Sequence, residues 1–168
     1  RADVLSGEHP NHAWIAANTN PDDVTGTLSD ALRGADVFLG VSAPDILTEA
    51  DVDSMAPDSI VFAMANPVPE IDPDIAARHA AVVATGRSDF ANQINNVLVF
   101  PGVFRGLIDS GVSHVDIDVL LAAADALAGV VLDGELNATY IIPSVFHPEV
   151  STVVAEAVKA AVAAREGS

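Results

Sequence analysis

The chain has 168 residues, with 7 lysines and arginines against 24 aspartates and glutamates, so its formal net charge is −17. This length is typical of a single domain that can bury a true hydrophobic core. The absence of cysteine excludes a disulfide scaffold, a zinc–thiolate site and a thiol nucleophile. The acidity argues against nucleic acid or an anionic membrane as a partner, because both are negatively charged. No apolar run reaches the roughly 18 residues that a membrane span requires.

The chain opens with Arg1 instead of methionine, and no basic stretch followed by an apolar segment predicts a signal peptide. We therefore expect a cytoplasmic polypeptide whose own beginning lies upstream of Arg1. Neither an internal repeat nor a Gly/Ser-rich linker indicates a second domain.

The first half of the chain alternates short helices with continuous apolar runs. Thr48 followed by Asp51 is typical of a capping box, and Asp72 before a proline is typical of a helix start. Strands that are apolar on both faces and separated by helices indicate parallel strands covered on two sides. The pattern therefore predicts a doubly wound α/β sheet. In order, we expect helix 27–34, strand 36–41, helix 48–55, strand 59–65, helix 72–80 and strand 81–85.

After Gly86 the pattern becomes helical. Residues 92–107 have helical spacing interrupted by Pro101 and Gly102, which predicts a kink or two consecutive helices. A further helix is expected over 116–131, capped by Asp116 or Asp118, and a last one from 148 to about 165. The last helix is amphipathic, and the apolar stripe on one of its faces must pack against another part of the protein. Its members are Val150, Val153, Val154, Ala157, Val158 and Ala161.

In an open parallel sheet, ligands bind beyond the carboxyl ends of the strands. The three expected strand exits fall at residues 42–44, 66–67 and 85–89. Each combines small or polar residues with a proline or a glycine, which suits close approach of a ligand to the backbone. Turns at strand ends need such residues in any case, and this simpler interpretation explains most of the pattern.

The sequence holds no complete acid–base or metal site. None of the five histidines has a spacing typical of zinc ligands, and no glycine-rich phosphate loop occurs. The acidic residues within 70–74 could attract a hard cation, but helix capping and the helix dipole explain them more simply. Tyr140 and Lys159, the only residues of their types, form no convincing catalytic pairing.

Residues 86–97 form the densest polar segment, directly before an apolar helix. Asn95 and Asn96 are poor helix formers at positions where that helix should already have begun. Their amides either cap the helix through local backbone bonds or point into the cleft and bind a carboxylate or hydroxyl. The residue types alone leave both interpretations open.

Five motifs follow one another in order over essentially the whole chain. They are GADVFLGVSAP at 34–44, FAMANPVPEI at 62–71, TGRSDF with NQINNV at 85–97, FPGVFRG at 100–106 and YIIPS at 140–144. Together they closely resemble the cofactor domain of bacterial malic enzymes, the oxaloacetate-decarboxylating type of malate dehydrogenase. The resemblance implies a partial Rossmann-like doubly wound parallel sheet followed by C-terminal helices. The chain would be the C-terminal portion of that NAD(P)-binding domain, with α/β units over about 1–90 and mainly helices over about 91–168.

The resemblance also implies an activity and a set of binding residues. The parent enzyme would oxidise and decarboxylate malate to pyruvate and CO₂ while reducing NAD or NADP, with Mg²⁺ or Mn²⁺ as a Lewis acid. By similarity, Ser42 and Ala43 would line the cofactor cleft and Asn66 would lie at its nicotinamide end. Asn95 and Asn96 would hold malate, and Asn96 would also reach the cofactor.

Several family features are missing from these residues. The family's catalytic tyrosine and lysine, its acidic metal ligands and its glycine-rich loop belong upstream, so we expect no catalytic residue and no metal ligand here. Tyr140 and Lys159 do not match the catalytic pair, and Ala91 and His147 depart from the usual proline and aspartate. Arg1 stands where such enzymes contact the adenosine ribose, and its guanidinium would favour a 2′-phosphate.

The expected partners are malate, the upstream portion of the same enzyme, and a second copy in a homodimer. If the central strands lie upstream, this chain alone exposes an unpaired strand edge and apolar faces. We then expect it to be stable only with the missing portion, or as a nicked or swapped assembly. The alternative hypothesis is a catalytically inert fragment that supplies only cofactor walls and oligomer contacts.

Overall fold

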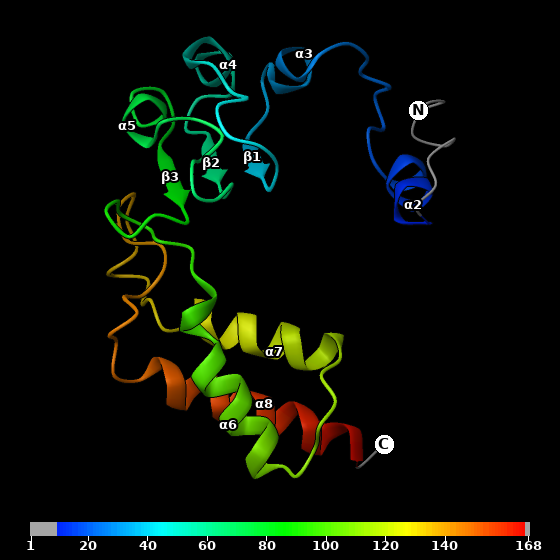
Figure 1. The fold of residues 1–168 in the computed structure, drawn as a ribbon, viewed down its shortest axis with the longest axis vertical. Helices are drawn as coiled ribbons and strands as arrows, with labels where there is room; N and C mark the ends of the chain where they lie inside the picture. The colour runs from blue at the N-terminus through cyan, green and yellow to red at the C-terminus, as the bar shows by residue number, and fades with distance from the viewer. Residues whose placement is uncertain (1–9, 167–168) are drawn as a thin grey trace.

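The computed structural model describes residues 10–166. A small α/β part and a helical part follow one another along the chain, as Figure 1 shows. The α/β part contains a parallel sheet of β1 (Val37–Gly40), β2 (Ile60–Ala63) and β3 (Val82–Thr85), in the order β1-β2-β3. The predicted α/β class is therefore confirmed, and each expected strand is present in a shorter form.

The short helices before and between the strands begin where their capping residues predict. These helices are α3 (Leu28–Leu32), α4 (Glu49–Asp53) and α5 (Pro73–Ala76). Capping boxes start α3 and α4, and the Asp72 carboxylate accepts a 2.9 Å hydrogen bond from the backbone N–H of Asp74 at the start of α5. Helix α5 ends four residues before the expected position 80. The chain must turn there, because the backbone N–H of Ala81 already donates to the Ser59 carbonyl at the start of the sheet.

One face of the sheet carries the core of the α/β part. Phe38 and Val61 on this face pack with Val52 and Met55 from the α4 region and Ala76 of α5. The opposite face is largely open among the described residues, where Val37 and Leu39 keep 51% and 61% of their surface exposed. Strand β1 also lies at an edge of this three-stranded sheet. Both features agree with the expected unpaired edge and apolar face.

The helical part has its own core between α6 (Phe100–Asp109), α7 (Ile117–Ala128) and α8 (Val150–Glu166). Gly102 and Gly106 let α6 approach α8 closely, since a Cβ on either would lie within 2.8 Å of α8 atoms. Asp116 caps α7 by accepting a hydrogen bond from Val119, so the first of the two expected caps is the one used. In the stripe of α8, Val154 is fully buried, whereas Val153 is exposed.

The expected helix over 92–107 begins later than predicted. Residues 92–95 are not helical, and a 3₁₀ turn, η1 (Asn96–Leu98), precedes α6. There are thus two consecutive helices, but Pro101 stands in the first turn of α6 and does not kink it. This agrees with the general tolerance of proline at helix starts, where the missing N–H has no partner to lose.

Helix α2 (Pro10–Asn18) was not anticipated from the sequence. Figure 1 shows it standing apart from the sheet and from the helical part. No helix within residues 10–166 combines the length and apolar character needed to cross a membrane.

Candidate functional site

The ends of β1 and β2 are joined by the side chain of Glu70. One carboxylate oxygen, Oε1, accepts hydrogen bonds from the Ser42 backbone N–H at 2.9 Å and from the Ser42 hydroxyl at 3.1 Å. The other oxygen, Oε2, accepts a bond from the Ala65 backbone N–H at 2.9 Å. Ser42 follows β1 and Ala65 follows β2, so a single carboxylate fixes the two strand exits next to each other.

Backbone hydrogen bonds continue this connection on both sides of the carboxylate. The N–H of Met64 donates to the Gly40 carbonyl at 3.1 Å, and the N–H of Leu47 donates to the Glu70 carbonyl at 2.9 Å. Between these bonds, the Asn66–Pro67 peptide is cis. The side chain of Asn66 is exposed, as are Ser42 and Ala43. Three predicted cofactor residues therefore lie together at the carboxyl edge of the sheet.

Glu70 is fully buried, and it forms no ion pair with any residue in the described part of the chain. Burial opposes its ionisation, but the N–H groups of Ala65 and Ser42 outweigh this effect and hold the pKa of Glu70 below its ordinary value. Glycine at position 40 leaves room for the carboxylate, since a Cβ there would lie 2.5 Å from it. Glu70 is therefore an ionised residue held by backbone dipoles.

This role of Glu70 corrects the interpretation of the acidic cluster at 70–74. Asp72 is the helix cap, as expected, whereas Glu70 contributes nothing to capping. Its partners lie 28 residues before it and 5 residues before it in the chain. The sequence shows only an acidic residue directly after Pro69, and this pattern does not reveal which residues the carboxylate contacts.

The segment that follows β3 returns to the end of that strand and pairs with it in a parallel bridge. The backbone N–H of Ile94 donates to the Thr85 carbonyl at 2.8 Å, next to an isolated bridge between Thr85 and Gln93. Arg87 forms an ion pair with Asp89 at 2.5 Å, and its guanidinium lies 4.7 Å from the centre of the Phe90 ring. The segment that carries Asn95 and Asn96 is thereby attached to the end of β3.

The structure gives the two asparagines different surroundings. The Asn95 side-chain oxygen accepts a 3.0 Å hydrogen bond from the Val97 backbone N–H, so Asn95 caps η1. Asn96 is exposed, and its side chain makes no hydrogen bond to any residue that the structure describes. The local cap thus accounts for the Asn95 oxygen, while the Asn96 amide remains available to a ligand.

Asn92 is a buried polar residue whose importance the sequence did not indicate. Its backbone has a φ of 56°, in the left-handed region that asparagine tolerates. Its amide nitrogen donates to the carbonyls of Val83 at 3.0 Å and Ala138 at 2.8 Å, and its oxygen accepts from the Ile141 N–H at 3.0 Å. Asn92 therefore ties β3 to the connection between α7 and α8.

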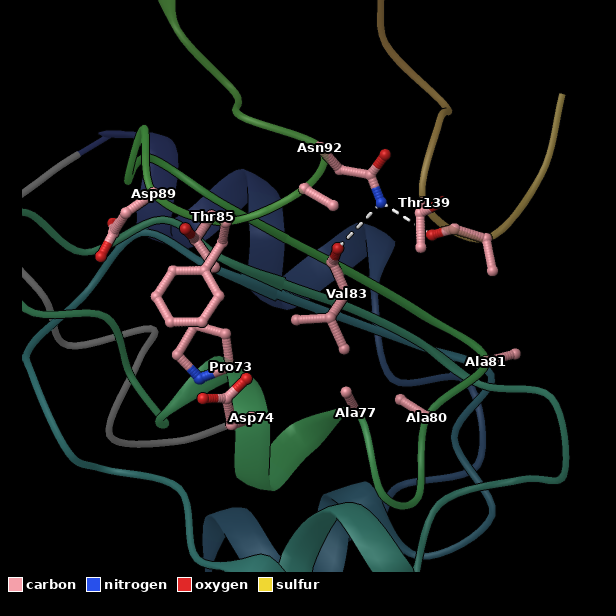
Figure 2. Close-up of a pocket in the computed structure, with 13 residues that line it drawn as sticks. Pro73, Asp74, Ala77, Ala80, Ala81, Val83, Thr85, Asp89, Asn92 and Thr139 are labelled. Carbon is pink, nitrogen blue, oxygen red and sulfur yellow. Dashed lines mark hydrogen bonds between the residues drawn. The ribbon is translucent and has the colours of Figure 1, made fainter. Parts of the chain in front are cut away.

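A cavity of about 700 Å³ lies beside β3, between that strand, α5 and the 138–139 segment. Figure 2 shows Asn92 and Thr139 at one end of this cavity and Ala80 at the other. None of the predicted binding residues lines it. The cavity is therefore separate from the predicted cleft at the strand ends of β1 and β2.

The other residues discussed in the sequence are the metal-ligand types, Tyr140, Lys159 and Arg1. No group of three or more histidine, aspartate or glutamate side chains within residues 10–166 is arranged to hold a metal ion. Lys159 is paired with Glu156 on α8 at 2.9 Å, and Tyr140 lies in the connection before that helix. Arg1 lies outside the described residues, so its predicted contact with the adenosine ribose has no structural counterpart here.

A parallel sheet with exposed polar residues at its carboxyl edge is typical of Rossmann-like domains, which bind their ligands at that edge. The chain belongs to the malic enzyme family, because the family model described as "Malic enzyme, NAD binding domain" matches residues 9–163. This finding confirms the resemblance carried by the five sequence motifs.

Individual relatives agree with the family. The chain is 57% identical over 151 residues to the NAD-dependent malic enzyme of Geobacillus stearothermophilus, covering 90% of this chain and 32% of that protein. It is 40% identical over 172 residues to the NADP-dependent malic enzyme of Escherichia coli, covering 92% and 23%. The solved NAD-dependent malic enzyme of Thermotoga maritima superposes with a TM-score of 0.84 at 42% identity, covering 94% and 41%. The chain thus spans about a third, or less, of the length of these curated relatives.

Proposed function

We propose that this chain is the C-terminal portion of the NAD(P)-binding domain of a malic enzyme, with α/β units over about 1–90 and mainly helices over about 91–168. The parent enzyme oxidises malate, whose C2 hydride passes to NAD(P)⁺, and releases CO₂ to leave pyruvate. The observation that carries the proposal is the family match over residues 9–163. The position of Ser42 and Asn66 at one sheet edge supports it.

The strand ends suit a nicotinamide cofactor. Ser42, Ala43 and Asn66 are exposed at the carboxyl edge of the sheet, where such folds bind their ligands. We assign Ser42 and Ala43 to the wall of the cofactor cleft and Asn66 to its nicotinamide end. When bound, the cofactor accepts the hydride. The residues named here position it and exclude water from one side.

Asn95 and Asn96 are assigned to malate, with Asn96 also facing the cofactor. The free amide of Asn96 and the N–H₂ group of Asn95 are donors, which suits a dicarboxylate substrate. Arg1 is assigned to the adenosine ribose, where it would favour NADP over NAD.

The described residues do not fit a divalent cation, because no three suitable side chains gather within 10–166. We therefore derive no step through Mg²⁺ or Mn²⁺ from this chain. The proposal assigns the metal ligands, and the catalytic tyrosine and lysine, to the upstream part of the parent enzyme.

Two further assignments belong to the same proposal. We place the parent enzyme in the cytoplasm, where malate and nicotinamide nucleotides are available together, and we expect a homodimer. Exposed apolar side chains on the outer side of α6, namely Phe100, Phe104 and Ile108, supply surface for further contacts of the parent protein.

The test uses the full-length polypeptide that carries this chain. Its intact mass is recorded first, and reduction of NAD and of NADP is then followed with malate and Mn²⁺. Malate-dependent reduction with release of pyruvate supports the proposal. A pure, intact protein that binds neither nucleotide and releases no pyruvate contradicts it and favours the inert-module alternative.

Two variants test the substrate assignment. Asn95→Asp keeps the oxygen that caps η1 but places a negative charge near malate, so η1 remains formed while malate binding weakens. Loss of one hydrogen bond to a charged group is worth about 1.5–3 kcal/mol, so Asn96→Ala should raise the KM for malate about 10-fold to 100-fold. Thr152→Ala, on the exposed side of α8, is the matched control and should leave the KM unchanged.

A further inference from the structure

Glu70 is the one fully buried carboxylate among the described residues, and neither a helix cap nor an ion pair explains it. A buried charge without a cation is costly unless hydrogen bonds compensate the hydration it loses, and the N–H groups of Ser42 and Ala65 do so here. The carboxylate in turn is the acceptor for these two backbone donors, so its effect falls on the backbone of the strand exits. Its three hydrogen bonds converge on the two strand exits that the proposed function assigns to the cofactor.

We propose that Glu70 is the positioning residue of the cofactor cleft. Its carboxylate holds the exits of β1 and β2 in the relative placement that lets Ser42 line the cofactor cleft while Asn66 lies at its nicotinamide end. The inference rests on the proposed function and extends it to a residue that does not itself contact the cofactor.

The geometry requires both oxygens of an ionised carboxylate. Oε1 serves the β1 exit through Ser42, and Oε2 serves the β2 exit through Ala65. The backbone N–H groups of Ser42 and Ala65 can only donate, so the amide of a glutamine would meet one of them with a donor of its own, whichever way the amide is turned. One of the two strand exits would then lose its hydrogen bond to the side chain at position 70.

A substitution at Gly40 would disturb the same carboxylate while leaving Glu70 itself unchanged. A Cβ added at position 40 would lie 2.5 Å from Glu70 Cδ and Oε1. Gly40→Ala therefore displaces the carboxylate, and also the Phe38 ring that would lie 2.7 Å from the same Cβ, without altering the charge or the hydrogen-bonding atoms of Glu70. If positioning is the role of Glu70, this substitution must have the same functional effect as Glu70→Gln.

The experiment measures two dissociation constants in the full-length enzyme. Binding of NAD or NADP and binding of malate are titrated separately in the wild type and in Glu70→Gln, Glu70→Asp and Gly40→Ala. Partial unfolding would raise both apparent dissociation constants by the same factor, so a difference between the nucleotide and malate separates positioning from loss of folded protein. Gly134→Ala is the matched control, because a Cβ there would meet no atom within 4 Å.

The positioning role predicts a selective effect on the cofactor. Glu70→Gln and Gly40→Ala should raise the Kd for the nucleotide about 10-fold to 100-fold, as expected for loss of a hydrogen bond to a charged group. Glu70→Asp, which keeps the charge on a shorter stem, should lie between these variants and the wild type. The Kd for malate should change much less in all three.

Other results would overturn the inference. Variants that lower the Tm but bind the nucleotide like the wild type would show a purely structural carboxylate, as would failure of all three to fold. An equal rise in the Kd for malate and for the nucleotide would also contradict selective positioning. If the wild-type enzyme itself binds no nucleotide, the proposed function fails, and this result is distinct from a failure limited to the variants.

Discussion

Replacing Asn92 should detach the segment before the asparagine pair from the sheet. The side chain is buried and makes three hydrogen bonds, to Val83, Ala138 and Ile141. Two of these partners lie 46 and 49 residues away in the chain. Asn92→Ala removes all three bonds at once and leaves their backbone partners without this side chain.

The magnitude follows from the bonds and from the backbone. Each hydrogen bond is worth about 0.5–1.5 kcal/mol net, so three together give about 2–4 kcal/mol. Alanine at a φ of 56° adds a further cost of about 1–2 kcal/mol, which glycine avoids. Asn92→Ala should therefore lower the free energy of unfolding by about 3–6 kcal/mol, and Asn92→Gly by about 1–2 kcal/mol less.

Denaturant unfolding of the full-length protein measures the total effect, and hydrogen exchange measures the local one. The amide of Ile141 should lose protection in both variants, because its acceptor is the Asn92 oxygen. Asn18→Ala is the matched control, since its side chain makes a local bond to Trp14 within an exposed helix. Losses below about 1 kcal/mol in both variants, with Ile141 still protected, would refute the reasoning.

Three other predictions concern packing, charge and assembly. Gly106→Ala should cost about 1–3 kcal/mol in denaturant unfolding, because its Cβ would lie 2.7 Å from Val158, whereas Gly134→Ala should cost nothing measurable. The hydrogen bond to Glu49 raises the pKa of His79 above 6.5, so the stability it contributes is full below 6.5 and is lost as the pH rises through the higher folded value. Glu49→Gln should lower that pKa in a proton NMR titration of the histidine ring. The 168-residue chain alone should associate or aggregate in sedimentation experiments, and a monodisperse monomer with a cooperative melt would contradict this expectation.

The parts of the fold that depend on neighbouring residues could be predicted from the sequence. Thr48 and Asp72 cap helices because their side chains reach backbone N–H groups two or three residues ahead. The apolar runs form parallel strands as predicted, but the expected cover on both faces is not present among the described residues, where Val37 and Leu39 are exposed. The end of α5 was misplaced, since its position depends on where the chain rejoins the sheet at Ser59.

The residues that organise the candidate site could not be predicted in this way. Glu70 and Asn92 act on partners 28 and 46 residues away, and no local pattern encodes such distances. The start of the helix near Asn95 was misjudged for a related reason. Apolar spacing favoured a helix from position 92, but the tertiary bonds of Asn92 fix a left-handed backbone that no helix can include.

Two of the buried polar side chains, Glu70 and Asn92, follow the same physical reasoning. A buried polar group adds little stability on average, because its hydrogen bonds mainly compensate the free energy lost when the group is removed from water. What such a group does provide is a defined geometry, because misplaced partners leave a buried donor or acceptor unsatisfied. Glu70 accepts hydrogen bonds from the exits of β1 and β2, and Asn92, three residues before Asn95, donates one to β3. These two side chains therefore constrain the geometry at the three strand ends, the edge that we propose binds the cofactor.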